Sequence, residues 1–170
     1  MTTPTRFKNY YFHRERQQED IEWVRPKDFQ SLTLKSPVVL INGAYDILTA
    51  PRMRLIFAAA HKAGTLVCAL DTDDKIKREK GDKRPILTFA ERAACLNYMP
   101  INYIVPIDNK ADMTWLIHYL KPDLRVQGAD YSGKPSRYNV KKMLVREGKL
   151  HTTDLIERIL KRYEKDPLDV

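Results

Sequence analysis

Blocks of consecutive apolar residues alternate along this chain with segments of helical periodicity. The first block, Val38 to Ile41, is a continuous apolar run typical of a parallel strand covered on both faces. Gly43 then marks a tight turn, and Pro51 suits the first turn of a following helix, where its missing N–H costs nothing. A strand, turn and helix of this kind direct free backbone N–H groups at the space above the turn, which favours phosphate there.

The same alternation continues through the chain and predicts a parallel α/β sheet with right-handed crossovers. We expect further strands at residues 65–70, 101–106 and 124–127. We expect helices at residues 51–63, 87–98, 111–120, 136–147 and 153–163, a charged loop or short helix at 71–84, and a short extended piece at 149–151. Gly64 is expected to close the first helix as a C-cap glycine.

Residues 1–36 are expected to form an N-terminal extension, followed by one core domain at residues 37–170. The extension is polar, contains a cluster of four aromatic residues between Phe7 and Phe12, and has a short helix expected near residues 14–23. One interpretation is an arm packed on the domain or on a second subunit. The other is a nucleic-acid contact made by its basic side chains with aromatic stacking.

Composition narrows the class of protein. A chain of 170 residues with 43% apolar residues suggests one domain with a proper core. No apolar run approaches the roughly 20 residues that span a bilayer, and the polar start shows no signal peptide, so we expect a cytoplasmic protein without membrane contact. Cys68 and Cys95 fit no metal spacing and are interpreted as reduced core residues. The net charge of +8 favours anionic partners.

Ligands of open α/β sheets bind beyond the carboxyl ends of the strands, so the segments after each strand are candidates for the site. After the first strand come residues 43–52, after the second residues 71–84, and after the fourth residues 128–131. Thr152 and Thr153 open the last helix. All four segments are expected to converge on one crevice.

Four motifs in these segments resemble the cytidylyltransferase-like family of nucleotidyltransferases. In chain order they are Gly43-Ala-Tyr-Asp46, Lys80-Gly-x-x-Arg84-Pro85 with Glu91-Arg92-Ala93 behind it, Leu120-Lys-Pro-Asp-Leu-Arg-Val-Gln-Gly-Ala-Asp-Tyr131, and Thr152-Thr-Asp-Leu-Ile156. They are most similar to the adenylyltransferase domain of ADP-heptose synthase, with glycerol-3-phosphate cytidylyltransferase as a further look-alike. The resemblance covers roughly residues 36–160.

The resemblance implies a Rossmann-like three-layer fold and a transferase reaction. A nucleotidyl group would pass from an NTP, either ATP or CTP, to a sugar phosphate or polyol phosphate with release of pyrophosphate. Mg²⁺ would accompany the NTP, and the family implies a homodimer. Such chemistry depends on in-line positioning and on positive groups where phosphate charge builds up.

The resemblance also implies roles for particular residues. The candidate catalytic residues are Thr49, Arg52 and Lys77. The candidate nucleotide-binding residues are Gly43, Ala44, Tyr45, Lys80, Arg84, Gly128, Asp130, Thr152 and Thr153. No protein ligand for a metal is expected. Structural alternatives stay open: a solvated charge run for the lysines, a helix N-cap for Thr49 or Thr152, and a structural role for Asp46.

The chain departs from the family pattern Gly-x-Phe-Asp-x-x-His-x-Gly-His. Thr49 and Arg52 stand at the two histidine positions, and Pro51 replaces the glycine between them. Arg52 can pair with phosphate oxygens but cannot pass a proton. Because losing one transition-state donor typically costs about 10²–10³ in rate, a second hypothesis is a catalytically inactive member that acts as a nucleotide-binding, scaffold or regulatory protein. A third is a nucleic-acid-binding protein.

Overall fold

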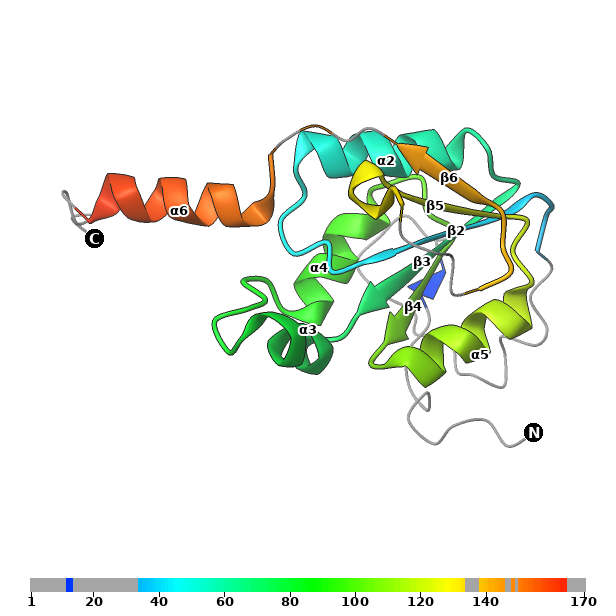
Figure 1. The fold of residues 1–170 in the computed structure, drawn as a ribbon, viewed down its shortest axis with the longest axis horizontal. Helices are drawn as coiled ribbons and strands as arrows, with labels where there is room; N and C mark the ends of the chain where they lie inside the picture. The colour runs from blue at the N-terminus through cyan, green and yellow to red at the C-terminus, as the bar shows by residue number, and fades with distance from the viewer. Residues whose placement is uncertain (1–11, 14–33, 134–137, 146–147, 149, 165–170) are drawn as a thin grey trace.

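The computed structural model describes residues 12–13, 34–133, 138–145, 148 and 150–164, and it shows a three-layer α/β fold (Figure 1). The sheet has the strand order β1-β4-β3-β2-β5-β6. Its strands are β1 (Phe12–His13), β2 (Val38–Gly43), β3 (Thr65–Asp71), β4 (Tyr103–Ile107), β5 (Leu124–Gly128) and β6 (Lys142–Val145). All pairings are parallel except that of β1 with β4. The predicted Rossmann-like fold class is confirmed.

Helices cover both faces of the sheet (Figure 1). They are α2 (Ala50–Ala60), α3 (Asp73–Lys80), α4 (Phe89–Asn97), α5 (Lys110–Leu120) and α6 (Thr152–Tyr163), and a 3₁₀ turn, η2 (Ala129–Tyr131), follows β5. Side chains alternate along β3, so that Leu66, Cys68 and Leu70 pack with α2 and α4, whereas Val67 and Ala69 pack with α5. The burial of all seven β3 residues explains its unbroken apolar sequence.

The last helix differs from the others. It projects away from the body of the molecule, and none of its described side chains is buried (Figure 1). None of the helices in the described part of the chain combines the length and apolarity that crossing a membrane requires.

The prediction of a helix at residues 136–147 is wrong. Lys142–Val145 forms strand β6 and pairs in parallel with Arg125–Gly128. Because β5 would otherwise present an open edge, pairing satisfies its backbone groups, and Met143 and Val145 pack against the core beside α2. Of the two segments expected here, at 136–147 and 149–151, residues 136–137, 146–147 and 149 lie outside the described residues.

Two smaller expectations are also wrong. Helix α2 ends at Ala60 with His61 as its C-cap, so Gly64 is not the cap. Gly64 instead allows a close approach: an added Cβ would lie 2.4 Å from the carbonyl oxygen of Ser36. Cys68 is buried as expected, but Cys95 is exposed on α4, and both cysteines are free.

Most of the expected N-terminal extension lies outside the described residues, including the helix expected at residues 14–23. The short strand Phe12–His13 joins the edge of the sheet by pairing with Tyr103 and Ile104 of β4. At the other end of the segment, Leu34 packs against the core on the α5 side. The Lys35 backbone N–H donates to Thr65 Oγ1 at 2.7 Å. The last residues before β2 therefore pack on the domain.

Candidate functional site

A cleft of about 360 Å³ opens at the carboxyl ends of β2, β3 and β5, where an open α/β sheet is expected to bind its ligand. One wall of the cleft consists of the turn after β2 and the start of α2. A second wall consists of α3 and the loop after it. The end of β5 and the first residue of α6 complete the lining. The residues that line the cleft are Asn42, Gly43, Ala44, Tyr45, Asp46, Ile47, Arg52, Leu55, Asp71, Lys75, Glu79, Lys80, Arg84, Gln127, Gly128, Tyr131 and Thr152.

The glycine turn is held by the residue that follows it. Tyr45 adopts a left-handed backbone conformation with φ of 47°, and its side chain is only 6% exposed. Its ring packs in the core that α2 and α4 share with the sheet. Burial of the ring compensates for a backbone conformation that non-glycine residues rarely adopt, and it keeps the turn Gly43–Ala44 at the cleft wall.

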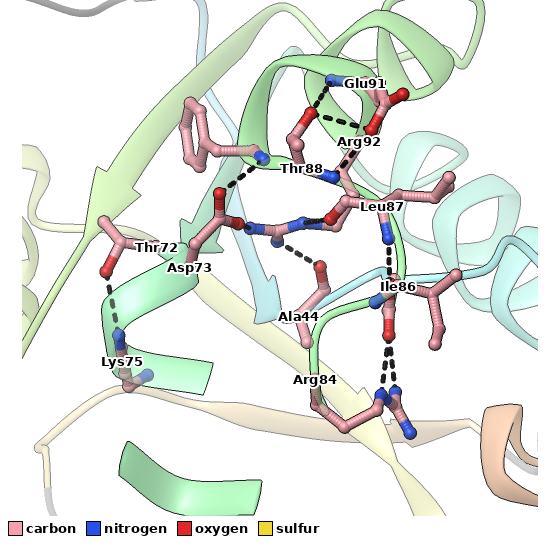
Figure 2. Close-up of polar contacts among 12 residues, drawn as sticks. Ala44, Thr72, Asp73, Lys75, Arg84, Ile86, Leu87, Thr88, Glu91 and Arg92 are labelled. Atoms are coloured by element: carbon pink, nitrogen blue, oxygen red, sulfur yellow. Dashed lines mark hydrogen bonds and ion pairs between the residues drawn. The ribbon is translucent and has the colours of Figure 1, made fainter. Parts of the chain in front are cut away.

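Asp46 anchors the basic loop to this turn. The carboxylate is 2% exposed, accepts three hydrogen bonds and forms an ion pair. Arg84 donates through Nε at 2.8 Å and pairs through Nη2 at 2.6 Å, and the backbone N–H groups of Ile86 and Leu87 donate at 2.8 and 2.9 Å (Figure 2). Both carboxylate oxygens of Asp46 are thus engaged by protein donors, which favours the structural role expected for this residue.

Arg92 joins three segments around the cleft. Its guanidinium is completely buried and donates to the carbonyl oxygens of Ala44 and Leu87 and, at 2.7 Å, to Asp73 Oδ1 (Figure 2). The ring of Phe89 lies 5.5 Å from the guanidinium carbon. One side chain of α4 therefore fixes the glycine turn, the start of α3 and the loop before α4 relative to one another.

Four basic side chains face the cleft: Arg52, Lys75, Lys80 and Arg84. Lys75 forms an ion pair with Asp71, whose pKa is raised by burial against the opposing effect of Lys75. Lys80 forms no ion pair with any described residue. Its pKa is lowered by partial desolvation and by the nearby Arg84 and Arg52. A ligand phosphate at this wall would relieve that repulsion.

The structure brings together eight of the twelve residues predicted for the site: Gly43, Ala44, Tyr45, Arg52, Lys80, Arg84, Gly128 and Thr152. Lys77 is exposed on α3, and Thr153 is exposed on α6, so neither lines the cleft. Asp130 lies in the turn η2, and its side chain lies outside the described part. The chemical roles of these residues remain predictions.

Thr49 is not on the cleft wall. It occupies the N-cap position of α2, but its side chain makes no capping hydrogen bond. The residue is 5% exposed, and Oγ1 is an enclosed polar atom without a hydrogen-bond partner among the described residues. The geometry gives its hydroxyl neither the capping role nor access to a ligand.

The N-cap of α6 is His151 rather than Thr152. The His151 backbone N–H donates to Asp154 Oδ2 at 2.7 Å, and the His151 side chain is exposed. Thr152 follows as the first helical residue and lines the cleft. The N-terminus of α6 therefore meets the site, as expected of the threonine motif.

Several cleft residues were not among the predicted ones. Asn42 and Gln127 each lie next to the end of a strand, so the rule about strand ends could have identified them, whereas Asp71 lies in the candidate segment 71–84 but had no role assigned. Lys75 lies one helical turn after Asp71, the spacing at which oppositely charged side chains meet. Arg92 had no such signal beyond its motif, because an arginine on a helix is usually solvated.

No group of three or more His, Cys, Asp or Glu side chains in the described ranges is placed to hold a metal ion. The two buried carboxylates on the cleft, Asp46 and Asp71, already accept from Arg84 and Lys75.

The fold and the position of the cleft define an α/β protein of the Rossmann-like class. Comparison with solved structures agrees: the lipopolysaccharide core biosynthesis protein of Thermoplasma volcanium matches 66% of this chain and 98% of its own with a TM-score of 0.54. At 18% identity this likeness concerns the fold alone. No protein-family model matches the chain.

Similarity in sequence is more specific. Bifunctional protein HldE of Syntrophotalea carbinolica is 36% identical over 138 residues, which are 75% of this chain and 28% of that protein. The proteins of the same name from Helicobacter pylori and Campylobacter concisus are 33% and 39% identical over 129 and 101 residues, or 74% and 59% of this chain. This chain spans only 21–28% of the length of these relatives. The matches confirm the resemblance to the cytidylyltransferase-like family.

Replacing Asp46 with asparagine should destabilise the fold strongly. The amide would place a donor against Arg84 or against the two N–H groups, and Arg84 would lose its buried partner, at a cost of about 3–5 kcal/mol in the free energy of unfolding. The matched control is Asp82→Asn on the same loop, which is exposed and should change stability by less than about 0.5 kcal/mol. Urea unfolding measures both, and equal stability of the two variants would contradict the anchoring role of Asp46.

Thr49→Val should raise stability by about 1 kcal/mol, because it removes an enclosed hydroxyl that no described group satisfies. The matched control is Thr88→Val, because the Thr88 hydroxyl caps α4 by accepting from the Glu91 N–H at 3.4 Å. Loss of this cap should lower the free energy of unfolding by about 1 kcal/mol. Denaturant midpoints compare the two. If Thr49→Val kept its fold but lost ligand binding or activity, the predicted catalytic role of Thr49 would be supported instead.

Proposed function

We propose that this chain binds a nucleoside triphosphate in the cleft and transfers its nucleotidyl group to a sugar phosphate or polyol phosphate, releasing pyrophosphate. The observation that carries the proposal is the convergence of a glycine turn, four basic side chains and a helix N-terminus on one cleft at the ends of parallel strands. The similarity to the bifunctional HldE proteins and to the motifs of the cytidylyltransferase-like family supports it.

In this proposal the chain acts by positioning and by charge. The turn Gly43–Ala44 lets the nucleotide approach the backbone closely, and Lys80 and Arg84 face its phosphates. Arg52 stabilises the charge that develops on the phosphate undergoing attack, since a guanidinium offers paired donors to two oxygens. Thr152 and the N-terminus of α6 offer further donors to the phosphates. Mg²⁺ would enter with the NTP, and a homodimer is the expected assembly.

The second candidate is a nucleotide-binding family member without transferase activity. Two observations favour it. No histidine lines the cleft as described, and the hydroxyl of Thr49, at the first signature histidine position, is enclosed in the protein. Proton transfer then has no side chain suited to neutral pH at this wall. Binding and turnover must therefore be measured separately.

Calorimetric titration with ATP, CTP, GTP and UTP in the presence of Mg²⁺ should show selective micromolar binding of one nucleotide. Lys80→Met should weaken that binding about 10- to 100-fold, because a charge-assisted hydrogen bond to phosphate is lost. Lys62→Met, on an exposed residue beyond the end of α2, removes the same charge away from the cleft and should have no effect.

Release of pyrophosphate from the bound NTP in the presence of sugar phosphates then distinguishes the two candidates, with Arg52→Ala as the inactive reference. Binding without pyrophosphate release would favour the inactive member. Absence of binding by all four nucleotides would contradict both, and would direct attention to the third hypothesis, a nucleic acid as partner.

Binding should also weaken as the pH rises into the alkaline range. The pKa of Lys80 in the free protein is lowered, and an adjacent phosphate favours its charged form and so raises that pKa. Above the pKa of the free protein, binding must therefore take up a proton, and affinity falls with increasing pH until the pKa of the complex is passed. Titrations in buffers of different ionisation enthalpy measure the proton uptake. Lys80→Met should abolish it, and unchanged uptake in that variant would assign the proton to another group.

A further inference from the structure

Asn42 lies at the carboxyl end of β2, next to the glycine turn, and lines the cleft. The side-chain carbonyl oxygen of Asn42 accepts hydrogen bonds from Arg125 of β5. Arg125 Nε and Nη2 lie 3.2 and 2.8 Å from Asn42 Oδ1. Both donors of the guanidinium edge therefore converge on one oxygen of the amide.

This contact fixes which way the amide is turned. Arginine carries only donors, so the group of Asn42 that faces it must be the carbonyl oxygen, and the NH₂ group must point away. Arg125 is itself held in place, because its guanidinium carbon lies 5.4 Å from the centre of the Tyr138 ring. A flipped amide would set two donors against two donors, which makes that orientation unfavourable.

The NH₂ group of Asn42 is open to the cleft. Neither of its protons has a hydrogen-bond partner among the described residues. Among the described residues, Thr49 Oγ1 is the only buried side-chain nitrogen or oxygen that lacks a hydrogen-bond partner. Asn42 Nδ2 also lacks a partner, so it is not buried and must reach solvent. Asn42 is only partly exposed, and the cleft is the space that it lines. The site thus contains an oriented pair of N–H donors in addition to its basic side chains.

We propose that Asn42 is a nucleotide-binding residue whose amide N–H groups donate to an oxygen of the bound NTP, and that Arg125 is the positioning residue that fixes this orientation. The inference rests on the proposed function, because it takes the nucleotide as the occupant of the cleft. Arg125 lies between β5 neighbours that face the opposite side of the sheet, and it acts on the ligand only through Asn42.

The test is a double-mutant cycle measured by calorimetry with the nucleotide that the unmodified protein binds. Asn42→Ala should weaken binding about 10-fold. Asn42→Asp should weaken it about 10- to 100-fold, because a carboxylate can still pair with Arg125 but offers the phosphates a negative charge. Asn139→Asp, on an exposed amide away from the cleft lining, is the matched control and should bind like the unmodified protein.

Arg125→Met keeps an apolar stem against Tyr138 but frees the amide of Asn42 to turn, so binding should weaken about 3- to 10-fold. In the Asn42→Ala background the same change should add nothing, within about twofold, because its effect passes through the amide. A general structural role of Arg125 would instead give the same loss in both backgrounds. Thermal unfolding of each variant verifies that it folds.

The outcomes separate the two levels of the proposal. Undiminished binding by both Asn42 variants, or equal effects of Arg125→Met in both backgrounds, would overturn the inference and leave the proposed function standing. Failure of the unmodified protein to bind any of the four nucleotides would overturn the proposed function, and the inference with it.

Discussion

The cleft depends on a guanidinium group that has no access to solvent. Burying a charge in a protein core is costly unless the charge is paired and hydrogen-bonded, and each of the three guanidinium nitrogens of Arg92 donates to an acceptor: two backbone carbonyl oxygens and the carboxylate of Asp73. The three acceptors belong to three different segments: the glycine turn, the start of α3 and the loop before α4. Since removing any one of them would leave a buried charge unsatisfied, the glycine turn, α3 and the loop before α4 are constrained to one relative arrangement.

Asp46 complements this arrangement with the opposite charge. It binds the same loop through Arg84 and two backbone N–H groups, so that a buried cation and a buried anion together fix residues 84–87. The side chains left to face a ligand, among them Lys80, are carried by segments that these two residues hold. Chemical groups at the surface of the cleft therefore owe their positions to ion pairs beneath it.

The sequence was sufficient to predict the elements whose side chains are buried on both faces or along one clear stripe. β2, β3 and α5 were predicted nearly to their bounds for this reason. It was not sufficient for Lys142–Val145, because four residues at the edge of a sheet carry too few side chains to distinguish a period of 2 from 3.6. These residues form a strand because they pair with the edge of β5, and that edge exists only in the assembled sheet.

The candidate site shows the same division. Strand ends indicated where Gly43, Arg84 and Gly128 would meet, since topology alone brings those ends together. The helical phase of α3 decides that Lys80 faces the cleft while Lys77 does not, and that phase depends on the burial of Ile76 in three dimensions. Likewise, the sequence marks Thr49 as a departure from the family pattern but cannot show that its hydroxyl is enclosed.

The lining of the cleft also has a consequence for ion balance. Its four basic and three acidic side chains leave one net positive charge. A nucleoside triphosphate carries several negative charges, so the free anion would replace a nearly neutral site by a strongly negative one. A nucleotide that brings its own cation leaves the site close to electroneutrality. If the cleft binds a nucleoside triphosphate as we propose, its charge favours the metal-complexed form of that nucleotide over the free anion.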